Sequence, residues 1–361
     1  MSAVVTVEDL VVGYGAVTAV EGINFAVEAG EQVTLLSPSG CGKTTILRAI
    51  AGLEHPRGGR IMIGPTTVYD ADAGIDVAPE KRGPSMVFQS YAIWPHMSVA
   101  ENVGFPLRVR GISRKAARPA VERALALVDL ADFTDRPATR LSGGQQQQVA
   151  LARAIAFETR VVLLDEPLSN LDAQLRIQMR SELVELRRRL AFTAIYVTHD
   201  QEEAFSLSDR IMVMRAGRIE QHGTPAEIHA TPRTRFVVGF LGVRNIIDAD
   251  IAGAAGDGAV EARLADGTML RARDPWGGGR NGRAAVAFRP SAVSLEATLA
   301  AGRQGCAGTI ARSLFTGDMA QVFVRCGPLE VCALVRPRPD FVVGSTVAWH
   351  VAPDDCLVLR E

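Results

Sequence analysis

The sequence of 361 residues has little of what a disulfide-stabilised, membrane-spanning or broadly basic protein needs. The cysteines are odd in number and include no Cys-x-x-Cys pair, which argues against a disulfide framework and against a zinc site. No apolar run approaches the roughly 18–20 residues that span a bilayer. With 39 Lys and Arg against 40 Asp and Glu, the formal charge is −1, which argues against a nucleic-acid binder that uses a broad basic surface.

The composition that remains is that of an ordinary globular protein, with 47% hydrophobic and 22% charged residues. At roughly 150 residues per domain, the length predicts two domains. The first nine residues contain two acids and no basic stretch, so we expect no signal peptide and interpret the thiols as cytosolic. Any association with a membrane is then expected to come through a partner.

Apolar runs alternate with helical patterns through the first two thirds of the chain. Continuous apolar or β-branched runs, typical of strands buried on both faces of a parallel sheet, occupy residues 33–36, 161–164 and 194–198. Between about 90 and 155 the apolar residues recur at helical spacing, as Val121, Leu125 and Val128 do. We therefore predict an α/β domain over residues 1–235 that contains a helical insert.

The last third has a different pattern. The capping box Thr224-Pro225-Ala226-Glu227 starts a short helix, and residues 229–242 are the predicted linker. Beyond it, hairpin-type turns at Asp266-Gly267 and Cys326-Gly327-Pro328 separate short alternating runs. These runs predict a small all-β domain over residues 243–361.

The most informative stretch reads Ser37-Pro38-Ser39-Gly40-Cys41-Gly42-Lys43-Thr44-Thr45. It follows an apolar run and precedes an apolar helix, so backbone N–H groups and the positive end of the helix converge on one point, as phosphate binding requires. Lys43 is placed to reach the β- and γ-phosphates of a nucleotide, and the Thr44 hydroxyl to ligate Mg²⁺. We predict a nucleotide site made by Ser39, Gly40, Cys41, Gly42, Lys43, Thr44 and Thr45.

Position 37 departs from this motif, which opens with glycine. Serine is strained if the strand exit needs a positive φ. Because the amides that hold phosphate come mostly from residues 40–45, we expect a modest effect. The alternative is a coincidental turn of glycine and serine residues.

A second motif, Asp165-Glu166, follows the apolar run at 161–164. Such a strand delivers both carboxylates to its carboxyl end, where ligands bind in open α/β sheets. We expect Asp165 to hold Mg²⁺ through water and Glu166 to polarise the attacking water. Adjacent acids alone are common on surfaces, and that alternative loses weight in a chain that also contains Lys43-Thr44.

Between these motifs lies Leu141-Ser142-Gly143-Gly144-Gln145, just before a helix that continues through residues 151–154. With this pentapeptide the sequence resembles the ABC ATPase family, for which it is the signature. The resemblance extends along essentially the whole chain. It implies a P-loop NTPase fold of ABC type, α/β with a helical insert at about 90–155, followed by a small all-β, OB-like domain, and it implies ATP hydrolysis with ATP and Mg²⁺ as cofactors.

The resemblance also implies roles for residues outside the phosphate loop. Tyr14 looks like the aromatic that stacks on adenine, with ordinary packing as the alternative. Gln89 looks like the Q-loop glutamine that touches Mg²⁺ and senses the membrane partner. His199 matches the switch histidine near the γ-phosphate, against a structural role, and Asp172 belongs to the D-loop match at residues 169–172.

In that family two chains pack head to tail around two ATP molecules. Ser142 and the amides of Gly143 and Gly144, with Gln145 beside them at a helix N-terminus, form a second anion site that caps the γ-phosphate held by the partner chain. Gln148 stands where the family usually has Arg. We expect that Arg to brace the helix or domain contacts and not to contact phosphate, so that its loss leaves ATP binding in place and bears on the hydrolysis rate.

The C-terminal region makes the chain look like the ATPase of a maltose, polyamine or iron(III) type importer, which carries a TOBE or OB-like accessory domain. The partners that this implies are a second copy, transmembrane permease subunits and, indirectly, a solute-binding protein, with no nucleic acid. The implied location is the cytoplasmic face of the inner membrane. Residues 91–97 are expected to border the groove for a permease helix, with core packing as the alternative.

The solute and the activity leave alternatives open. The wording of residues 93–97 favours iron(III), polyamine or phosphonate over sugars. One rival is a regulatory or nucleic-acid-linked ABC ATPase, whose usual coiled coil, zinc hook or second cassette is not found in this sequence. Another is a degenerate subunit that binds ATP with a mainly regulatory role, which Ser37 and Gln148 motivate and the intact Lys43, Asp165, Glu166 and His199 oppose.

Overall fold

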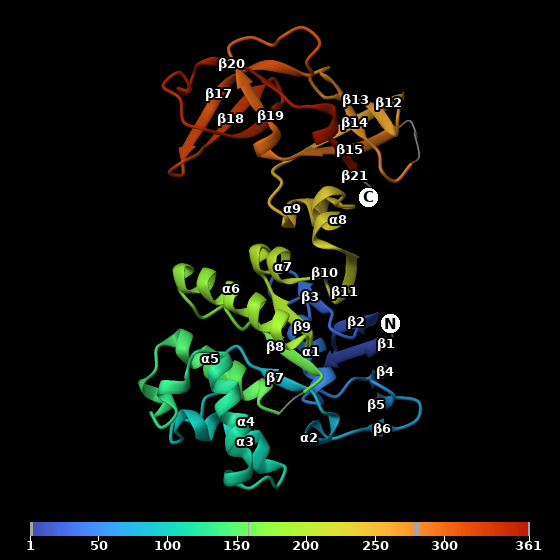
Figure 1. Ribbon diagram of the computed structural model, residues 1–361. Helices are drawn as coiled ribbons and strands as arrows, with labels where there is room; N and C mark the ends of the chain where they lie inside the picture. Colours follow the sequence, from blue (N-terminus) through green and yellow to red (C-terminus); the bar gives the residue numbers. More distant parts are fainter. Residues whose placement is uncertain (1–2, 158, 278–281, 360–361) are drawn as a thin grey trace. The chain divides into compact units, whose positions relative to one another are not determined.

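The computed structural model describes residues 3–157, 159–277 and 282–359. The chain divides into two compact units, residues 1–228 and 229–361, which are described here one at a time. Figure 1 shows the labelled elements of both units. Unit 1 is mixed α/β and unit 2 is built mainly of strands, which confirms the predicted fold class.

The central layer of unit 1 is a sheet in the strand order β11-β10-β3-β9-β8-β7. Its strands are β3 (Gln32–Leu36), β7 (Ser85–Val87), β8 (Val161–Asp165), β9 (Thr193–Thr198), β10 (Arg210–Arg215) and β11 (Arg218–Gly223). All neighbours pair in parallel except β10 and β11. Every residue of β3, β8 and β9 is buried, as the continuous apolar runs predicted. Because β3, β9 and β8 run in the same direction, the carboxyl ends of β3 and β8 reach the same edge of the sheet.

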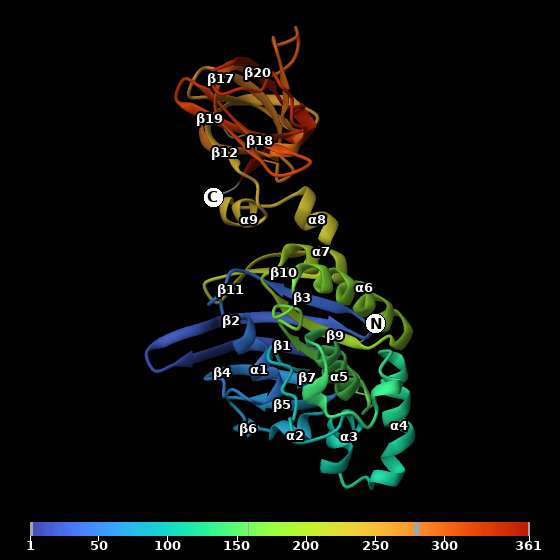
Figure 2. The ribbon, with the colours of Figure 1, turned by 90° about the vertical axis from the view of Figure 1, so that its left-hand side faces the viewer.

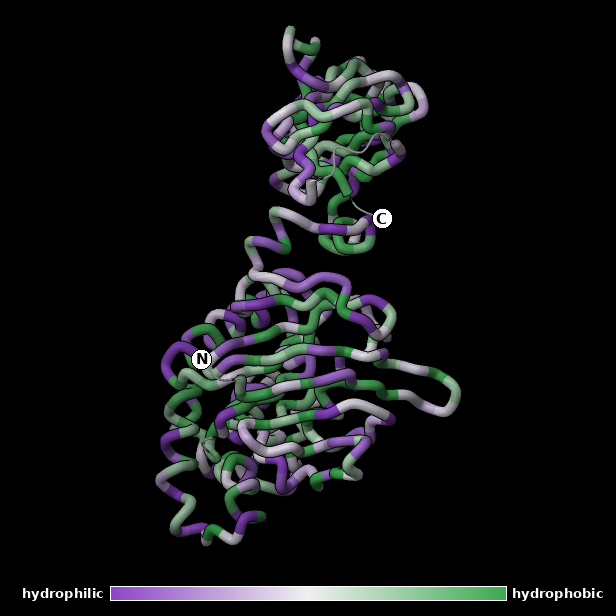
Figure 3. Tube along the Cα trace, turned by 90° about the vertical axis from the view of Figure 1, so that its right-hand side faces the viewer, coloured by the Kyte–Doolittle hydropathy of each residue, from purple (hydrophilic) through white to green (hydrophobic). Residues whose placement is uncertain are grey.

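A second, antiparallel sheet of unit 1 has the order β2-β1-β4-β5-β6. Its strands are β1 (Ala3–Tyr14), β2 (Val17–Glu28), β4 (Gly58–Ile63), β5 (Thr66–Asp70) and β6 (Ile75–Asp76). Buried and exposed residues alternate along much of β1 and β2, and the trace changes between hydrophobic and hydrophilic colours along these strands (Figure 3). The inner face of this sheet shares one core with α1 and β3, which fixes the helix that follows the phosphate loop.

The helices of unit 1 are α1 (Lys43–Ala51), α2 (Pro79–Arg82), α3 (Val99–Val109), α4 (Arg114–Leu127), α5 (Gly143–Ile155), α6 (Ala173–Leu190) and α7 (Gln201–Leu207). Helices α3, α4 and α5 pack on one another and lie together in Figures 1 and 2. Ser98 starts α3 with a capping box to Glu101. These three helices form the helical insert.

Unit 2 holds a closed barrel of β12-β13-β14-β21-β15 and a sheet in the order β16-β20-β17-β18-β19, within the described residues. The strands are β12 (Asn245–Gly256), β13 (Ala259–Leu264), β14 (Met269–Arg273), β15 (Gly282–Phe288), β16 (Ser294–Glu296), β17 (Gly305–Phe315), β18 (Ala320–Cys326), β19 (Leu329–Val335), β20 (Thr346–His350) and β21 (Leu357–Leu359). The rings of Phe288 and Trp349 stack 5.7 Å apart in its core.

Near residue 228, where the two units divide, the chain forms two short helices, α8 (Pro225–Ala230) and α9 (Arg235–Phe240). The capping box at the start of α8 is confirmed: Glu227 N donates to Thr224 Oγ1 at 3.2 Å, and Thr224 N donates to Glu227 Oε2 at 2.8 Å. Residues 229–242, expected as a linker, lie in unit 2, because Val238 of α9 packs with Val243 and with residues of β15 and β21.

The five cysteines are free thiols, as their number and spacing predicted. Among the helices of the described ranges, none has both the length and the apolar character needed to cross a membrane.

Candidate functional site

The phosphate loop leaves β3 at Ser37 and enters α1 at Lys43, which is the strand–loop–helix arrangement that the motif requires. Gly40 and Gly42 have φ of 84° and 91°. A Cβ on Gly42 would meet the carbonyl oxygen of Ala19 at 2.4 Å, so only glycine fits there. Thr44 and Thr45 lie in the first turn of α1, and Ser39 and Gly40 are exposed at the tip of the loop, where a ligand can reach their amides.

Lys43 is folded back onto this loop. Its Nζ donates to the carbonyl oxygens of Ser37 at 2.8 Å and Pro38 at 3.0 Å, and to Ser37 Oγ at 3.1 Å. The side chain is only 4% exposed. Burial lowers the pKa of Lys43, and the charge of Glu166 opposes this shift. The ammonium therefore lies at the loop that would cradle a phosphate.

The glycine-to-serine departure at position 37 does not strain the backbone. Ser37 is not among the residues with positive φ, and it is fully buried at the end of β3. Its Oγ donates to the Pro38 carbonyl oxygen at 2.9 Å. This loop therefore differs from one that opens with glycine by the hydroxyl of Ser37, and not by its backbone conformation.

Thr44 and Asp165 meet between α1 and the end of β8. Thr44 Oγ1 donates to Asp165 Oδ1 at 2.7 Å. Asp165 is 3% exposed, and burial raises its pKa, while the hydrogen bond from Thr44 opposes the rise. A hydroxyl and a carboxylate side by side next to a phosphate loop are hard oxygen donors of the kind that Mg²⁺ takes together with nucleotide phosphates, so the residues present fit this ion.

Glu166 follows directly and has φ of 43°, which is uncommon for a residue with a side chain. Its N–H donates to the carbonyl oxygen of Val197 at 3.0 Å, which ties this conformation to β9. The carboxylate Oε2 lies 3.1 Å from His199 Nδ1 and 3.5 Å from Gln89 Nε2. The structure thus brings together the three residues predicted to be catalytic.

Gln89 makes further contacts that the sequence analysis missed. Its Nε2 donates to Ser169 Oγ at 3.2 Å, and its carbonyl oxygen accepts from Asn170 Nδ2 at 2.8 Å. Ser169 Oγ donates in turn to the carbonyl oxygen of Glu166 at 2.9 Å. The side chain of Gln89 therefore points to Glu166 and Ser169, and not to Thr44 or Asp165. The only sequence signal for this contact was the D-loop match itself.

The signature residues have a local role in the single chain. Ser142 caps α5, since its Oγ accepts from Gln145 N at 3.3 Å and Gln145 Oε1 accepts from Ser142 N at 3.0 Å. Ser142 and Gly143 are exposed, while Gly144 packs against Leu175 of α6. The first turn of α5 thus presents backbone amides to a ligand from outside the chain.

Asp172 is held by a helix cap, and Tyr14 lies at a hairpin. Asp172 caps α6 by accepting from Leu175 N at 2.9 Å. Tyr14 ends β1 at an exposed hairpin and is 49% exposed. The hairpin is fixed by Arg57, whose Nη2 donates to the carbonyl oxygen of Gly15 at 2.6 Å. The exposed Tyr14 ring is available for stacking.

Gln148 is the second residue at which this chain departs from the family pattern. Its Nε2 donates to Glu182 Oε2 at 2.9 Å, and Glu182 also accepts from Gln178 at 2.9 Å. Gln148 thus joins α5 to α6 through one hydrogen bond.

Arg153, also on α5, makes buried contacts that sequence reasoning missed. It is 6% exposed, and its guanidinium donates to the carbonyl oxygens of Tyr91 and Ala92 at 2.6 Å each. It also lies over the ring of Trp94 at 4.8 Å. Burial lowers the pKa of Arg153 to about 10. A signal existed: an arginine at a position where its helical neighbours Val149, Ala150, Ala152 and Ala154 are buried needs a buried partner.

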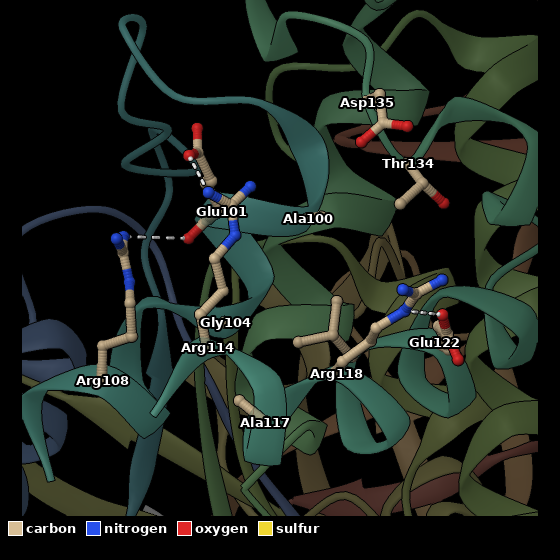
Figure 4. A pocket seen from close by; sticks show the side chains of 11 residues that line it. Ala100, Glu101, Gly104, Arg108, Arg114, Ala117, Arg118, Glu122, Thr134 and Asp135 are labelled. Carbon is tan, nitrogen blue, oxygen red and sulfur yellow. Dashed lines mark hydrogen bonds and ion pairs between the residues drawn. The ribbon is translucent and has the colours of Figure 1, made fainter. Parts of the chain in front are cut away.

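The segment expected to border a permease groove is partly core and partly surface. Tyr91 is buried, and the Trp94 ring lies 4.1 Å from that of Phe105, whereas Pro95 and His96 are exposed. A pocket of about 270 Å³ opens between α3 and α4 of the same insert (Figure 4). Its floor is small or apolar, and its rim is charged, with ion pairs on both sides: Glu101 with Arg114, and Arg118 with Glu122.

The fold and the site together define a P-loop nucleotide-binding ATPase of ABC type. In comparison with known families, the ABC transporter family matches residues 20–169, and the TOBE domain matches residues 286–359. The chain belongs to the ABC transporter ATP-binding proteins and is an importer ATPase with a TOBE domain.

Individual relatives support this assignment. The "Fe(3+) ions import ATP-binding protein FbpC" of Rhizobium etli is 46% identical over 313 residues, which cover 87% of this chain and 85% of that protein. The protein of the same name from Agrobacterium fabrum is 46% identical over 307 residues, covering 84% and 82%. Among solved structures, cbiO1 of Clostridium perfringens, part of the ABC transporter complex cbiONQ, matches with a TM-score of 0.57 and 28% identity, covering 68% of this chain and 96% of that chain.

Proposed function

We propose that this importer ATPase hydrolyses ATP with Glu166 as the group that polarises the attacking water. The observation that carries the proposal is the meeting of Gln89, Glu166 and His199 at the carboxyl ends of β8 and β9, next to the phosphate loop. The carboxylate of Glu166 contacts both neighbours, which favours one orientation of the group. His199, half exposed beside it, is placed to contact the γ-phosphate.

We assign nucleotide binding to Ser39, Gly40, Cys41, Gly42, Lys43, Thr44 and Thr45, with Tyr14 stacking on the adenine. Thr44 and Asp165 would hold Mg²⁺, with Gln89 as a further ligand after its amide turns from Glu166. The ion supplies charge stabilisation for the phosphates when it is bound. Lys43 binds the β- and γ-phosphates by exchanging its contacts within the loop for phosphate oxygens.

The active form that we propose is a head-to-tail homodimer. Ser142, Gly143, Gly144 and Gln145 offer an anion site at the start of α5, and in a single chain Ser142 and Gln145 bond to each other. A partner chain's γ-phosphate is a ligand of the right charge for this site. Asp172 would approach the partner's nucleotide from the start of α6.

Transmembrane permease subunits are the partners of an importer ATPase, and we place this chain on the cytoplasmic face of the inner membrane through them. The exposed Pro95 and His96 and the pocket between α3 and α4 support the helical insert as the docking region. A solute-binding protein would take part indirectly. For the solute we propose iron(III), because the relatives at 46% identity are named as Fe(3+) import proteins; a polyamine or a phosphonate is the alternative.

The test of the activity is Mg²⁺-dependent ATP hydrolysis by the purified chain at rising protein concentration. We expect turnover that rises more than linearly, because each site needs the partner's Ser142 region. Glu166→Gln should remove turnover while retaining ATP binding, and Lys43→Ala should remove both. Turnover unchanged in either variant would contradict the assignment of that residue.

Tight ATP binding without turnover has two explanations, which the addition of a reconstituted cognate permease separates. Turnover that appears only with the permease supports the importer motor. Continued absence of turnover supports the degenerate subunit with a regulatory role.

The test of the solute is uptake of ⁵⁵Fe(III) by cells that lack the gene for this chain. Loss of uptake that returns with the intact gene, and not with Glu166→Gln, is the expected result. Unchanged iron uptake together with lost polyamine or phosphonate uptake would replace iron(III) by that solute.

A further inference from the structure

We propose that the Ser37 hydroxyl retains Lys43 in the phosphate loop of the nucleotide-free chain and so weakens the binding of ATP. This inference rests on the proposed function, because it assumes that the loop binds a nucleoside triphosphate. It concerns a position at which this chain departs from the glycine of the motif.

The contacts of Lys43 account for all of its donors. An ammonium group has three N–H donors. The acceptors are the Ser37 carbonyl at 2.8 Å, the Pro38 carbonyl at 3.0 Å and Ser37 Oγ at 3.1 Å. A phosphate oxygen can therefore bind Lys43 only by displacing one of the three.

The hydroxyl is the acceptor that a glycine at position 37 would not supply. With glycine, one donor of Lys43 would remain free in a buried site and would be ready for a phosphate oxygen. Ser37 is fully buried and Lys43 is 4% exposed, so water replaces neither partner easily. When Lys43 turns toward a phosphate, Ser37 Oγ keeps its own hydrogen bond to Pro38 but loses the one that it accepts.

Backbone effects do not explain the difference between serine and glycine here. Ser37 does not have a positive φ, so the serine conformation is an ordinary one and glycine brings no relief of strain. Because Lys43 is buried with Ser37, each acceptor of its ammonium group matters to the stability of the nucleotide-free loop.

The test compares the binding of adenylyl imidodiphosphate, an ATP analogue with a P–N–P bridge, to the full chain and to Ser37→Ala and Ser37→Gly in the presence of Mg²⁺. Loss of one hydrogen bond in the free state predicts that Ser37→Ala lowers the Kd by about two- to tenfold. Ser37→Gly should lower it at least as much. Ser313→Ala, an exposed serine on β17 of unit 2, serves as the matched control and should leave the Kd unchanged.

A second measurement checks the physical cause. Without nucleotide, Ser37→Ala should unfold at a lower temperature than the unsubstituted chain, and with saturating analogue this difference should shrink. An unchanged Kd in Ser37→Ala would overturn the inference. Weaker binding would also overturn it and would show that the hydroxyl contacts the nucleotide, while an effect confined to Ser37→Gly would assign the effect to the backbone. If the unsubstituted chain itself binds no analogue, the proposed function fails, which is a separate result.

Discussion

Arg153 Nη2 donates a hydrogen bond of 2.6 Å to the carbonyl oxygen of Tyr91, and Nη1 donates one of the same length to Ala92. Tyr91 and Ala92 have φ of 62° and 46°, so two consecutive residues with side chains adopt the left-handed conformation. Tyr91 and Ala92 follow shortly after Gln89 in the chain. Arg153 lies on α5, the helix that begins at the signature residues. One buried side chain thus fixes the loop that joins two parts of the site.

Arg153→Met should lower the free energy of unfolding of the chain by about 2–4 kcal/mol, because it leaves the buried carbonyl group of Tyr91 and the partly buried one of Ala92 without their donor beside a strained turn. Arg153→Lys keeps the charge and can bond one carbonyl, so its loss should be intermediate. Chemical denaturation followed by circular dichroism measures both.

The control for Arg153 is Arg188→Met, at an exposed position of α6, which should change the free energy by less than about 0.5 kcal/mol. Equal stability of Arg153→Met and the unsubstituted chain would contradict the role of Arg153.

Gln148→Ala should cost about 1 kcal/mol of stability, since it removes the partly buried hydrogen bond between α5 and Glu182 of α6. Gln148→Arg, which introduces the family's usual residue, should restore the contact as an ion pair and leave the KM for ATP unchanged. The matched control is Gln178→Ala, which removes the exposed hydrogen bond to the same Glu182 and should cost less. A changed KM in Gln148→Arg would show that this position acts on the nucleotide.

Glu203 is a buried carboxyl of α7 that contacts β9, and it predicts a pH dependence of stability. Its Oε2 accepts from Tyr196 at 2.8 Å and from Thr198 at 2.7 Å. Burial raises the pKa of Glu203 above its ordinary value of 4.5, although these hydrogen bonds oppose the rise. Above pH 4.5 the unfolded chain has released a proton that the folded chain still holds, so this contribution to stability is lost as the pH rises through the raised pKa.

Glu203→Gln keeps an acceptor for both hydroxyl groups and cannot ionise. Its unfolding temperature, relative to the unsubstituted chain, should therefore increase as the pH rises from about 4.5 to about 7.5. Glu202→Gln, whose side chain is 78% exposed, is the control and should show no such trend. A difference that stays constant with pH would contradict the raised pKa of Glu203.

The domain limits 1–235 and 243–361 can be tested by truncation. A chain of residues 1–242 should bind ATP as tightly as the full chain, because every residue assigned to the nucleotide lies before 200. It should also expose Val238, which packs on β15 and β21 in unit 2. Comparison with a chain of residues 1–230 should show equal ATP affinity and higher solubility for the shorter one. Loss of ATP binding in both would refute the predicted boundary.

Much of the site was predictable because local sequence carries its chemistry. The strand–loop–helix around Lys43 and the acids after β8 need only short-range patterns, and the structure places Thr44 against Asp165. The contact of Ser169 with Gln89 was not predictable in this way, since 80 residues separate the two and each is a common polar residue. Whether Ser37 is strained depends on its φ, which a sequence motif does not give. The structure shows that this φ is not positive.

The sequence by itself determined the class of protein, the parallel strands and the residues that we propose to meet the phosphates. Buried apolar runs, glycine spacing and capping residues act over a few residues, and their physics is the same in any fold. Only the tertiary structure decided which partners the polar side chains take: Lys43 with Ser37, Gln148 with Glu182, and Arg153 with Tyr91. The reason is that a buried polar group must find a partner wherever packing brings one, and packing joins elements that are distant along the chain.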